Sequence, residues 1–217
     1  VKAKSSNVFR MPSHLSFEQG SALPLAGVTA YRAVFSRAKV SPGENVLITG
    51  IGGGVATMAL QFVLAEGANV FVTSGSNEKV KKATDLGAKS GALYTDPDWT
   101  KQILYQSKGK IDVIIDGTGG NTLSALLDIV SYGGRIVIYG STLGQAENVN
   151  LHRIYWKQIS LLGSTMGSDN DFSQMLRFVG ERGLVPVIDS IYNLEDIVTA
   201  FQKMQNSEQF GKIVLRI

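Results

Sequence analysis

The segment Asn45-Val-Leu-Ile-Thr-Gly-Ile-Gly-Gly-Gly-Val-Ala56 joins a short apolar run to a glycine-rich loop. Asn45–Thr49 has the composition of a buried strand, and beyond the glycines apolar residues recur at helical spacing as far as Gly67. The same succession of apolar run, glycine turn and helical stretch repeats along the chain. Strands that are apolar throughout and separated by helices are typical of a parallel sheet covered on both faces. The sequence therefore predicts an α/β fold with a doubly wound parallel sheet.

The expected strands of this sheet are Asn45–Thr49, Asn69–Thr73, Gly91–Tyr94, Ile111–Ile115, Gly134–Tyr139 and Ile159–Gly163. The helices between them are expected near residues 58–67, 78–86, 99–105 and 122–129, and a longer helix over 26–38 precedes the first strand. After the last of these strands, the pattern predicts a helix at 172–182, a strand at 187–191, a helix at 194–204 and a strand at 212–216.

The composition is that of an ordinary globular protein: of 217 residues, 44% are hydrophobic and 18% are charged. The net charge of +3 comes from basic residues spread along the chain, so no nucleic-acid partner is expected. Apolar runs are well short of the ~20 residues of a membrane span, so no membrane association is expected. The chain has no cysteine, which excludes disulfides, thiol nucleophiles and cysteine-ligated metals. This composition fits a reducing compartment, and we expect a cytoplasmic protein.

The glycine loop, residues 50–56, lies where ligands bind in doubly wound sheets, beyond the carboxyl end of a strand. Its glycines let backbone N–H groups approach a pyrophosphate, and the helix that follows offers its positive N-terminus. The loop ends Gly-Val-Ala and not Gly-Lys-Ser/Thr, so it is not a P-loop. The pattern indicates a dinucleotide site; the alternative is a turn whose glycines serve only tight packing.

The end of the second strand indicates which dinucleotide binds. NAD sites hold the ribose hydroxyl with an acidic residue about 20 residues beyond the glycines, and here that position is Ser74. Glu78 falls in the next helix, so no carboxylate is expected to repel a 2′-phosphate. Ser74 and Ser76 can donate hydrogen bonds and Lys79 supplies a positive charge, which favours NADPH over NADH. The alternative is that these are solvated turn residues.

Motifs along nearly the whole chain resemble one family. They are Ala22-Leu-Pro-Leu-Ala-Gly-Val-Thr-Ala-Tyr31, Gly43-Glu-Asn-Val-Leu-Ile-Thr-Gly50, Gly133-Gly-Arg-Ile-Val137, Gly163-Ser-Thr-Met-Gly167 and Gly211-Lys-Ile-Val-Leu215. Their order and spacing resemble the medium-chain dehydrogenase/reductases, in particular the zinc-independent, quinone-oxidoreductase-like branch, whose members are often labelled zinc-type alcohol dehydrogenase-like. The resemblance implies a Rossmann cofactor domain over residues 24–167. Residues 1–23 would end a GroES-like catalytic domain that is otherwise absent, and 168–217 would return to it.

The resemblance also implies roles for particular residues. Thr29 would pack against the nicotinamide and Lys212 would lie near the cofactor phosphates or ribose. Leu25 stands where zinc-dependent members have a catalytic zinc ligand, so no catalytic metal is expected. The pyrophosphate would be held by Gly50, Gly53, Gly54 and Val55. The nicotinamide half would be lined by Thr118, Gly140, Ser141, Ser164, Thr165 and Met166.

The expected function is an NADPH-dependent oxidoreductase that transfers hydride to a small quinone, enone or aldehyde. No catalytic residue is assigned, because His14 and His152 are expected at surface or packing positions. The alternative is a non-enzymatic dinucleotide-binding module that acts as a redox sensor or structural protein. We also expect a homodimer formed through Gln158–Gly163 as an edge strand, unless the segment Leu151–Lys157 covers that edge.

Overall fold

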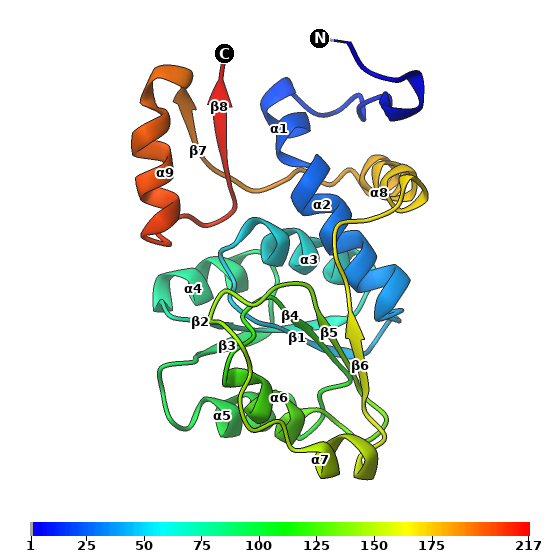
Figure 1. The fold of residues 1–217 in the computed structure, drawn as a ribbon, viewed down its shortest axis with the longest axis vertical. Helices are drawn as coiled ribbons and strands as arrows, with labels where there is room; N and C mark the ends of the chain where they lie inside the picture. The colour runs from blue at the N-terminus through cyan, green and yellow to red at the C-terminus, as the bar shows by residue number, and fades with distance from the viewer. Residues whose placement is uncertain (1) are drawn as a thin grey trace.

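Residues 2–217, the part of the chain that the computed structural model describes, contain a six-stranded parallel sheet (Figure 1). Its strand order is β3-β2-β1-β4-β5-β6. The strands are β1 (Asn45–Ile48), β2 (Asn69–Ser74), β3 (Ser90–Leu93), β4 (Val113–Asp116), β5 (Arg135–Ile138) and β6 (Ser160–Gly163). The order reverses between β1 and β4, which is the switch point of a doubly wound sheet. The predicted fold class is confirmed.

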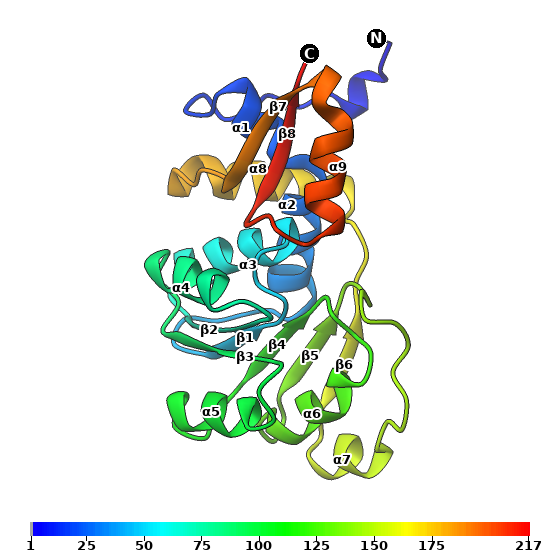
Figure 2. The same cartoon turned by 90° about the vertical axis from the view of Figure 1, so that its left-hand side faces the viewer.

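Helices cover both faces of the sheet, as the apolar strands require. On one face lie α2 (Pro24–Tyr31), α3 (Gly54–Ala65) and α4 (Asn77–Asp85), and on the other α5 (Trp99–Gln106), α6 (Thr122–Ile129) and α7 (Leu151–Trp156) (Figure 2). The pleat of β1 sends side chains to each face in turn. Val46 and Ile48 pack with the first group of helices, whereas Leu47 packs with the second. Both faces are therefore hydrophobic cores.

The helix before the first strand differs from the expected range of 26–38. It begins at Pro24, because proline at the first turn loses no helical hydrogen bond. After Tyr31 it continues as a π-helical segment, η2 (Arg32–Arg37). The wider turn carries Phe35 into a cluster with Tyr31, Phe62 and Phe178, where ring centroids lie 4.8–6.3 Å apart.

The remaining elements lie at one end of the molecule, beyond α3 (Figures 1 and 2). They are η1 (Ser5–Asn7), α1 (Phe17–Ala22), α8 (Asp169–Arg182), β7 (Ile188–Asn193), η3 (Leu194–Asp196), α9 (Ile197–Gln205) and β8 (Lys212–Arg216). The predicted helices and strands after the sixth strand are confirmed within a few residues. β7 and β8 pair with each other in parallel, apart from the large sheet. An ion pair of 3.0 Å between Arg216 and Glu18 joins β8 to α1.

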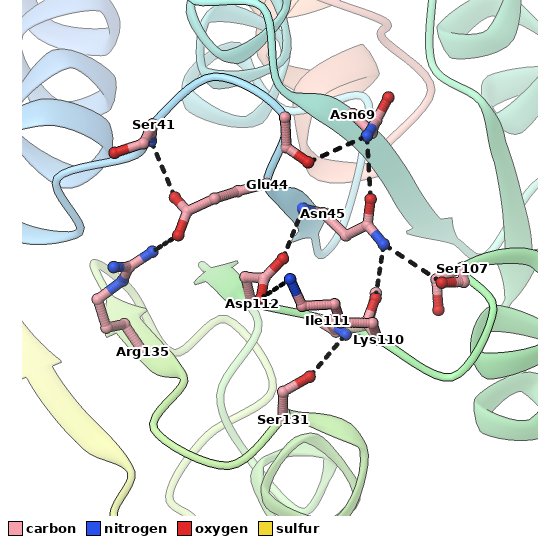
Figure 3. Close-up of polar contacts among 11 residues, drawn as sticks. Ser41, Glu44, Asn45, Asn69, Ser107, Lys110, Ile111, Asp112, Ser131 and Arg135 are labelled. Atoms are coloured by element: carbon pink, nitrogen blue, oxygen red, sulfur yellow. Dashed lines mark hydrogen bonds and ion pairs between the residues drawn. The ribbon is translucent and has the colours of Figure 1, made fainter.

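A polar network holds the amino ends of the strands in register (Figure 3). The Asn45 amide nitrogen donates to the carbonyls of Ser107 and Lys110, at 3.2 and 2.9 Å, and its oxygen accepts from Asn69 at 3.1 Å. The Asp112 carboxylate accepts from the Asn45 backbone N–H at 3.0 Å. These bonds tie β1 to β2 and to the chain entering β4. This network lies at the edge of the sheet opposite the carboxyl ends of the strands.

None of the helices formed by residues 2–217 combines the length and apolar character needed to cross a bilayer.

Candidate functional site

A cleft of about 690 Å³ opens at the carboxyl ends of the central strands. It is lined by Gly50, Ile51, Gly53, Ser74, Gly75, Ser76, Glu78, Lys79, Lys82, Tyr94, Thr118, Thr142, Leu143, Ser207, Glu208 and Gln209. The lining comes from the glycine loop, from the turn between β2 and α4 and from α4 itself, from the loops after β3, β4 and β5, and from the connection between α9 and β8. The cleft lies at the switch point, where the sequence predicted a ligand.

The glycine loop folds back across the end of β1. Gly50 and Gly52 have φ of +61° and +122°, which side chains other than glycine rarely adopt. A Cβ at Gly50 would lie 2.9 Å from the Thr118 methyl carbon, so the loop and the β4 end are in close contact. α3 begins at Gly54, and its N-cap Gly53 has no side chain to bond the first-turn N–H groups. These N–H groups and the helix dipole can therefore bind an anion in the cleft.

The turn between β2 and α4 uses its serines for local hydrogen bonds. The Ser74 side chain is buried; its hydroxyl donates to the Ile51 carbonyl at 3.4 Å and accepts from the Ser76 N–H at 3.2 Å. The Ser76 hydroxyl caps α4 by accepting from the Lys79 N–H at 3.4 Å. Ser74 must break its bond to Ile51 before it can donate to a ligand, a constraint that the sequence did not show.

Lys79, the expected positive charge, lines the cleft together with other charged side chains. The Lys79 ammonium donates to the Ser207 carbonyl, and burial lowers the pKa of Lys79. Lys82 and Glu78 form an ion pair of 2.7 Å, and the hydrogen bond from Lys82 lowers the pKa of Glu78. Glu78 and Glu208 both line the cleft. Glu78 lies in α4, as expected, but it lines the cleft, and a second carboxylate, Glu208, reaches the cleft from a distant segment. That no carboxylate opposes a 2′-phosphate stays a prediction.

Two residues expected at the nicotinamide lie side by side although they are far apart in sequence. The Thr29 hydroxyl donates to the Leu25 carbonyl at 2.8 Å and lies 4.0 Å from the Met166 sulfur. Met166 follows β6 with a φ of +44°. The Ser164 N–H donates to the Ile138 carbonyl at 2.9 Å, while its buried hydroxyl has no hydrogen-bond partner within residues 2–217.

The other expected residues adjoin these groups without lining the cleft. A Cβ at Gly54 would lie 2.6 Å from the Lys212 Cδ, so that side chain crosses the start of α3. A Cβ at Gly140 would lie 3.1 Å from the Gly117 carbonyl oxygen, so the chain after β5 passes close to the chain after β4. Of the expected set, Gly50, Gly53, Ser74, Ser76, Lys79 and Thr118 line the cleft, whereas Thr29, Gly54, Val55, Gly140, Ser141, Ser164, Thr165, Met166 and Lys212 do not. Their roles in binding stay predictions.

Sequence reasoning missed several lining residues. Tyr94 follows β3, and a signal for it existed, because the ends of parallel strands meet at one edge. Lys82 lies one helical turn after Glu78, so its position was also accessible to reasoning from helical spacing. Ser207, Glu208 and Gln209 had no such signal, since only the tertiary fold carries them to the cleft.

Leu25 is 57% exposed on α2, and a leucine side chain offers no atom that could bind a metal. Within residues 2–217, no group of three or more histidine, aspartate or glutamate side chains is placed to hold a metal ion.

Comparison with known proteins gives consistent matches. The family model for zinc-binding dehydrogenases matches residues 54–181. The chain is 37% identical to the zinc-type alcohol dehydrogenase-like protein YogA of Leptosphaeria maculans, over 100% of this chain and 63% of that protein. It is 33% identical to the quinone oxidoreductase of Homo sapiens, over 98% of this chain and 67% of that protein.

Solved structures give the same result. A structure described as an NAD-dependent alcohol dehydrogenase matches with a TM-score of 0.92 at 34% identity, over 99% of this chain and 63% of that one. The chain thus spans about two thirds of the length of the relatives it matches. Family model, relatives and structure agree with the motifs seen in the sequence: this chain belongs to the medium-chain dehydrogenase/reductases, within the zinc-binding dehydrogenase family.

Proposed function

We propose that this chain binds NADPH across the carboxyl edge of its sheet. It would form the cofactor-binding part of a reductase that passes hydride to a quinone, enone or aldehyde without a catalytic zinc. The observation that carries the proposal is the cleft in which the N-terminus of α3 adjoins Ser74 and Lys79. The relatives named quinone oxidoreductase and alcohol dehydrogenase support the reaction class. Leu25 supports the absence of zinc, since it has no donor atom.

In this proposal the bound dinucleotide supplies the hydride, and the chain supplies position and charge. The first-turn N–H groups of α3 would bind the pyrophosphate. Lys79 would pair with the 2′-phosphate, with Ser76 beside it. Thr29, on α2, and Met166, just after β6, lie next to each other and would hold one face of the nicotinamide ring.

The test is a calorimetric titration of the chain with NADPH and with NADH, repeated on Ser74→Asp. Ser74→Asn is the matched control, because it has the size of aspartate without its charge. We expect the wild-type chain to bind NADPH more tightly. Ser74→Asp should weaken NADPH binding at least about tenfold relative to Ser74→Asn, because a carboxylate at that position repels the phosphate. Tighter NADH binding by the wild type contradicts the choice of NADPH.

A folded chain that binds neither dinucleotide contradicts the proposal as a whole. Oxidation of NADPH by simple quinones, enones and aldehydes, followed by absorbance, then tests the reaction class. Binding without turnover of any of the three classes would favour a dinucleotide-binding module that is not an enzyme.

A further inference from the structure

The connection between α9 and β8, residues 206–211, forms a wall of the cleft. Three of its residues, Ser207, Glu208 and Gln209, line the cleft opposite the turn between β2 and α4. Figure 2 shows this connection descending from α9 onto α3 before it turns into β8. The connection reaches the site although more than 120 residues separate it from that turn.

Contacts on both sides fix the connection in place. The Gly211 N–H donates to the Gly52 carbonyl at 2.9 Å, which ties the connection to the glycine loop. The Phe210 N–H donates to Asp189 at 2.8 Å, and the Lys82 ammonium lies 6.0 Å from the centre of the Phe210 ring. The Lys79 ammonium donates to the Ser207 carbonyl. The connection is therefore part of the site and not a loose neighbour.

The charges that face each other across this part of the cleft are balanced. Lys79 and Lys82 line one side together with Glu78, which is paired with Lys82 at 2.7 Å. Glu208 lines the other side; it is exposed, and its carboxylate accepts from the Asn206 amide at 3.0 Å. A ligand with one extra phosphate would meet attraction from Lys79 and repulsion from Glu208.

Lys79 links the two sides of the cleft, α4 and the connection between α9 and β8. Its ammonium bonds the carbonyl of Ser207, and Glu208 is the next residue, with consecutive Cα atoms about 3.8 Å apart. A 2′-phosphate paired with Lys79 would thus lie beside the cleft wall that carries Glu208. We infer that Glu208 is a specificity-determining residue that opposes the 2′-phosphate and so limits the preference for NADPH over NADH. This inference rests on the proposed dinucleotide site.

The test compares Glu208→Gln with the wild type by calorimetric titration with NADPH, NADH and 2′,5′-ADP. Glu195→Gln is the matched control, because Glu195 is an exposed glutamate in η3 that does not line the cleft. Glu208→Gln should bind NADPH and 2′,5′-ADP about three- to tenfold more tightly at low salt, with NADH binding unchanged. The gain should shrink at high salt, since it is electrostatic. A merely structural effect would not depend on salt.

The inference is overturned if Glu208→Gln leaves NADPH binding unchanged or tightens NADPH and NADH alike. It is also overturned if the gain is the same at low and high salt. A folded wild-type chain that binds none of the three ligands would contradict the proposed function itself, and the inference about Glu208 would then be overturned as well. Binding of NADPH by the wild type with no effect of Glu208→Gln leaves the proposed function standing and removes only the role of Glu208.

Discussion

Asp116, at the carboxyl end of β4, carries a fully buried carboxylate that shapes the floor of the site. One oxygen accepts from the Thr49 hydroxyl at 2.6 Å and from the Thr118 hydroxyl and N–H at 2.7 and 3.0 Å. The other accepts from the Gly119 N–H at 3.2 Å. Thr118 lines the cleft and Gly119 has a φ of +60°. The carboxylate thus fixes the backbone of the loop after β4 against the glycine loop.

Asp116→Asn should destabilise the protein by about 1–3 kcal/mol. The amide nitrogen of asparagine cannot accept a hydrogen bond, so at least one buried donor loses its partner. Urea unfolding measures the free energy of unfolding. Asp85→Asn is the control, because Asp85 pairs with Lys81 on the exposed face of α4 and its loss should cost about 0.5 kcal/mol or less. If both variants lose the same free energy of unfolding, the buried hydrogen bonds of Asp116 stabilise the protein no more than an exposed ion pair does.

The β6 strand forms one edge of the large sheet, and its outer side is open. Ser160, Leu161 and Gly163 are exposed, so α7 does not cover them. The N–H groups of Ser160 and Ser164 donate inward to the chain at β5. Because donors alternate along a strand, the N–H of Leu161 points outward. We propose that this edge pairs with the same edge of a second copy, as an unpaired apolar edge strand favours.

Leu161→Pro should therefore convert a dimer to a monomer. Proline removes the outward N–H and leaves the inward bonds of β6 intact. Leu161→Ala is the control, because it removes the side chain and keeps the N–H. Analytical ultracentrifugation measures the mass of each variant. A wild-type chain that is monomeric, or a Leu161→Pro variant that stays dimeric, contradicts pairing through β6.

The elements that the sequence predicted well are those set by local patterns. β1 and the glycine loop were readable because an apolar run meets glycines that need positive φ. The π-helical η2 was not readable, because the wider turn depends on the packing of Phe35 against Phe178. In the site, Ser74 was placed correctly at the end of β2, but its burial and the arrival of Glu208 depend on contacts between distant segments. Sequence reasoning therefore missed the charged residue that a distant segment brings to the cleft.

One partly buried ion pair joins the two parts of the molecule, the large sheet with its helices and the elements that follow β6. Asp171 on α8 accepts from Arg32 at 2.6 Å and from the Ser36 hydroxyl at 2.5 Å, both on η2. It also accepts from the Ser168 backbone N–H at 2.8 Å, while the Asp171 N–H donates to the Ser168 hydroxyl at 3.1 Å, which closes a capping box at the start of α8. Close packing accompanies it: a Cβ at Gly27 would lie 2.6 Å from the Met175 sulfur.

Burial alone would raise the pKa of Asp171, but hydrogen bonds from Ser36, Ser168 and Arg32 outweigh it and hold the pKa well below its usual range. The ionised form is thus favoured in the folded state. The stabilisation is fully present above the unfolded pKa of about 3.9, and it is lost as the pH falls from there toward the lower folded value. Acid should therefore loosen the attachment of α8.

Asp171→Asn should destabilise the protein by about 2 kcal/mol at pH 7, less than a fully buried pair, because Arg32 is 32% exposed. Urea unfolding from pH 7 to pH 3 measures the free energy of unfolding of both proteins. The difference between variant and wild type should stay constant down to about pH 4. Below that, the difference should narrow by about 1.4 kcal/mol per pH unit, because the unfolded wild type then takes up a proton that the folded state refuses. Asp169→Asn, exposed on the same helix turn, should show only a small difference throughout. A difference for Asp171→Asn that does not change with pH would mean that its carboxylate charge does not hold α8 in place.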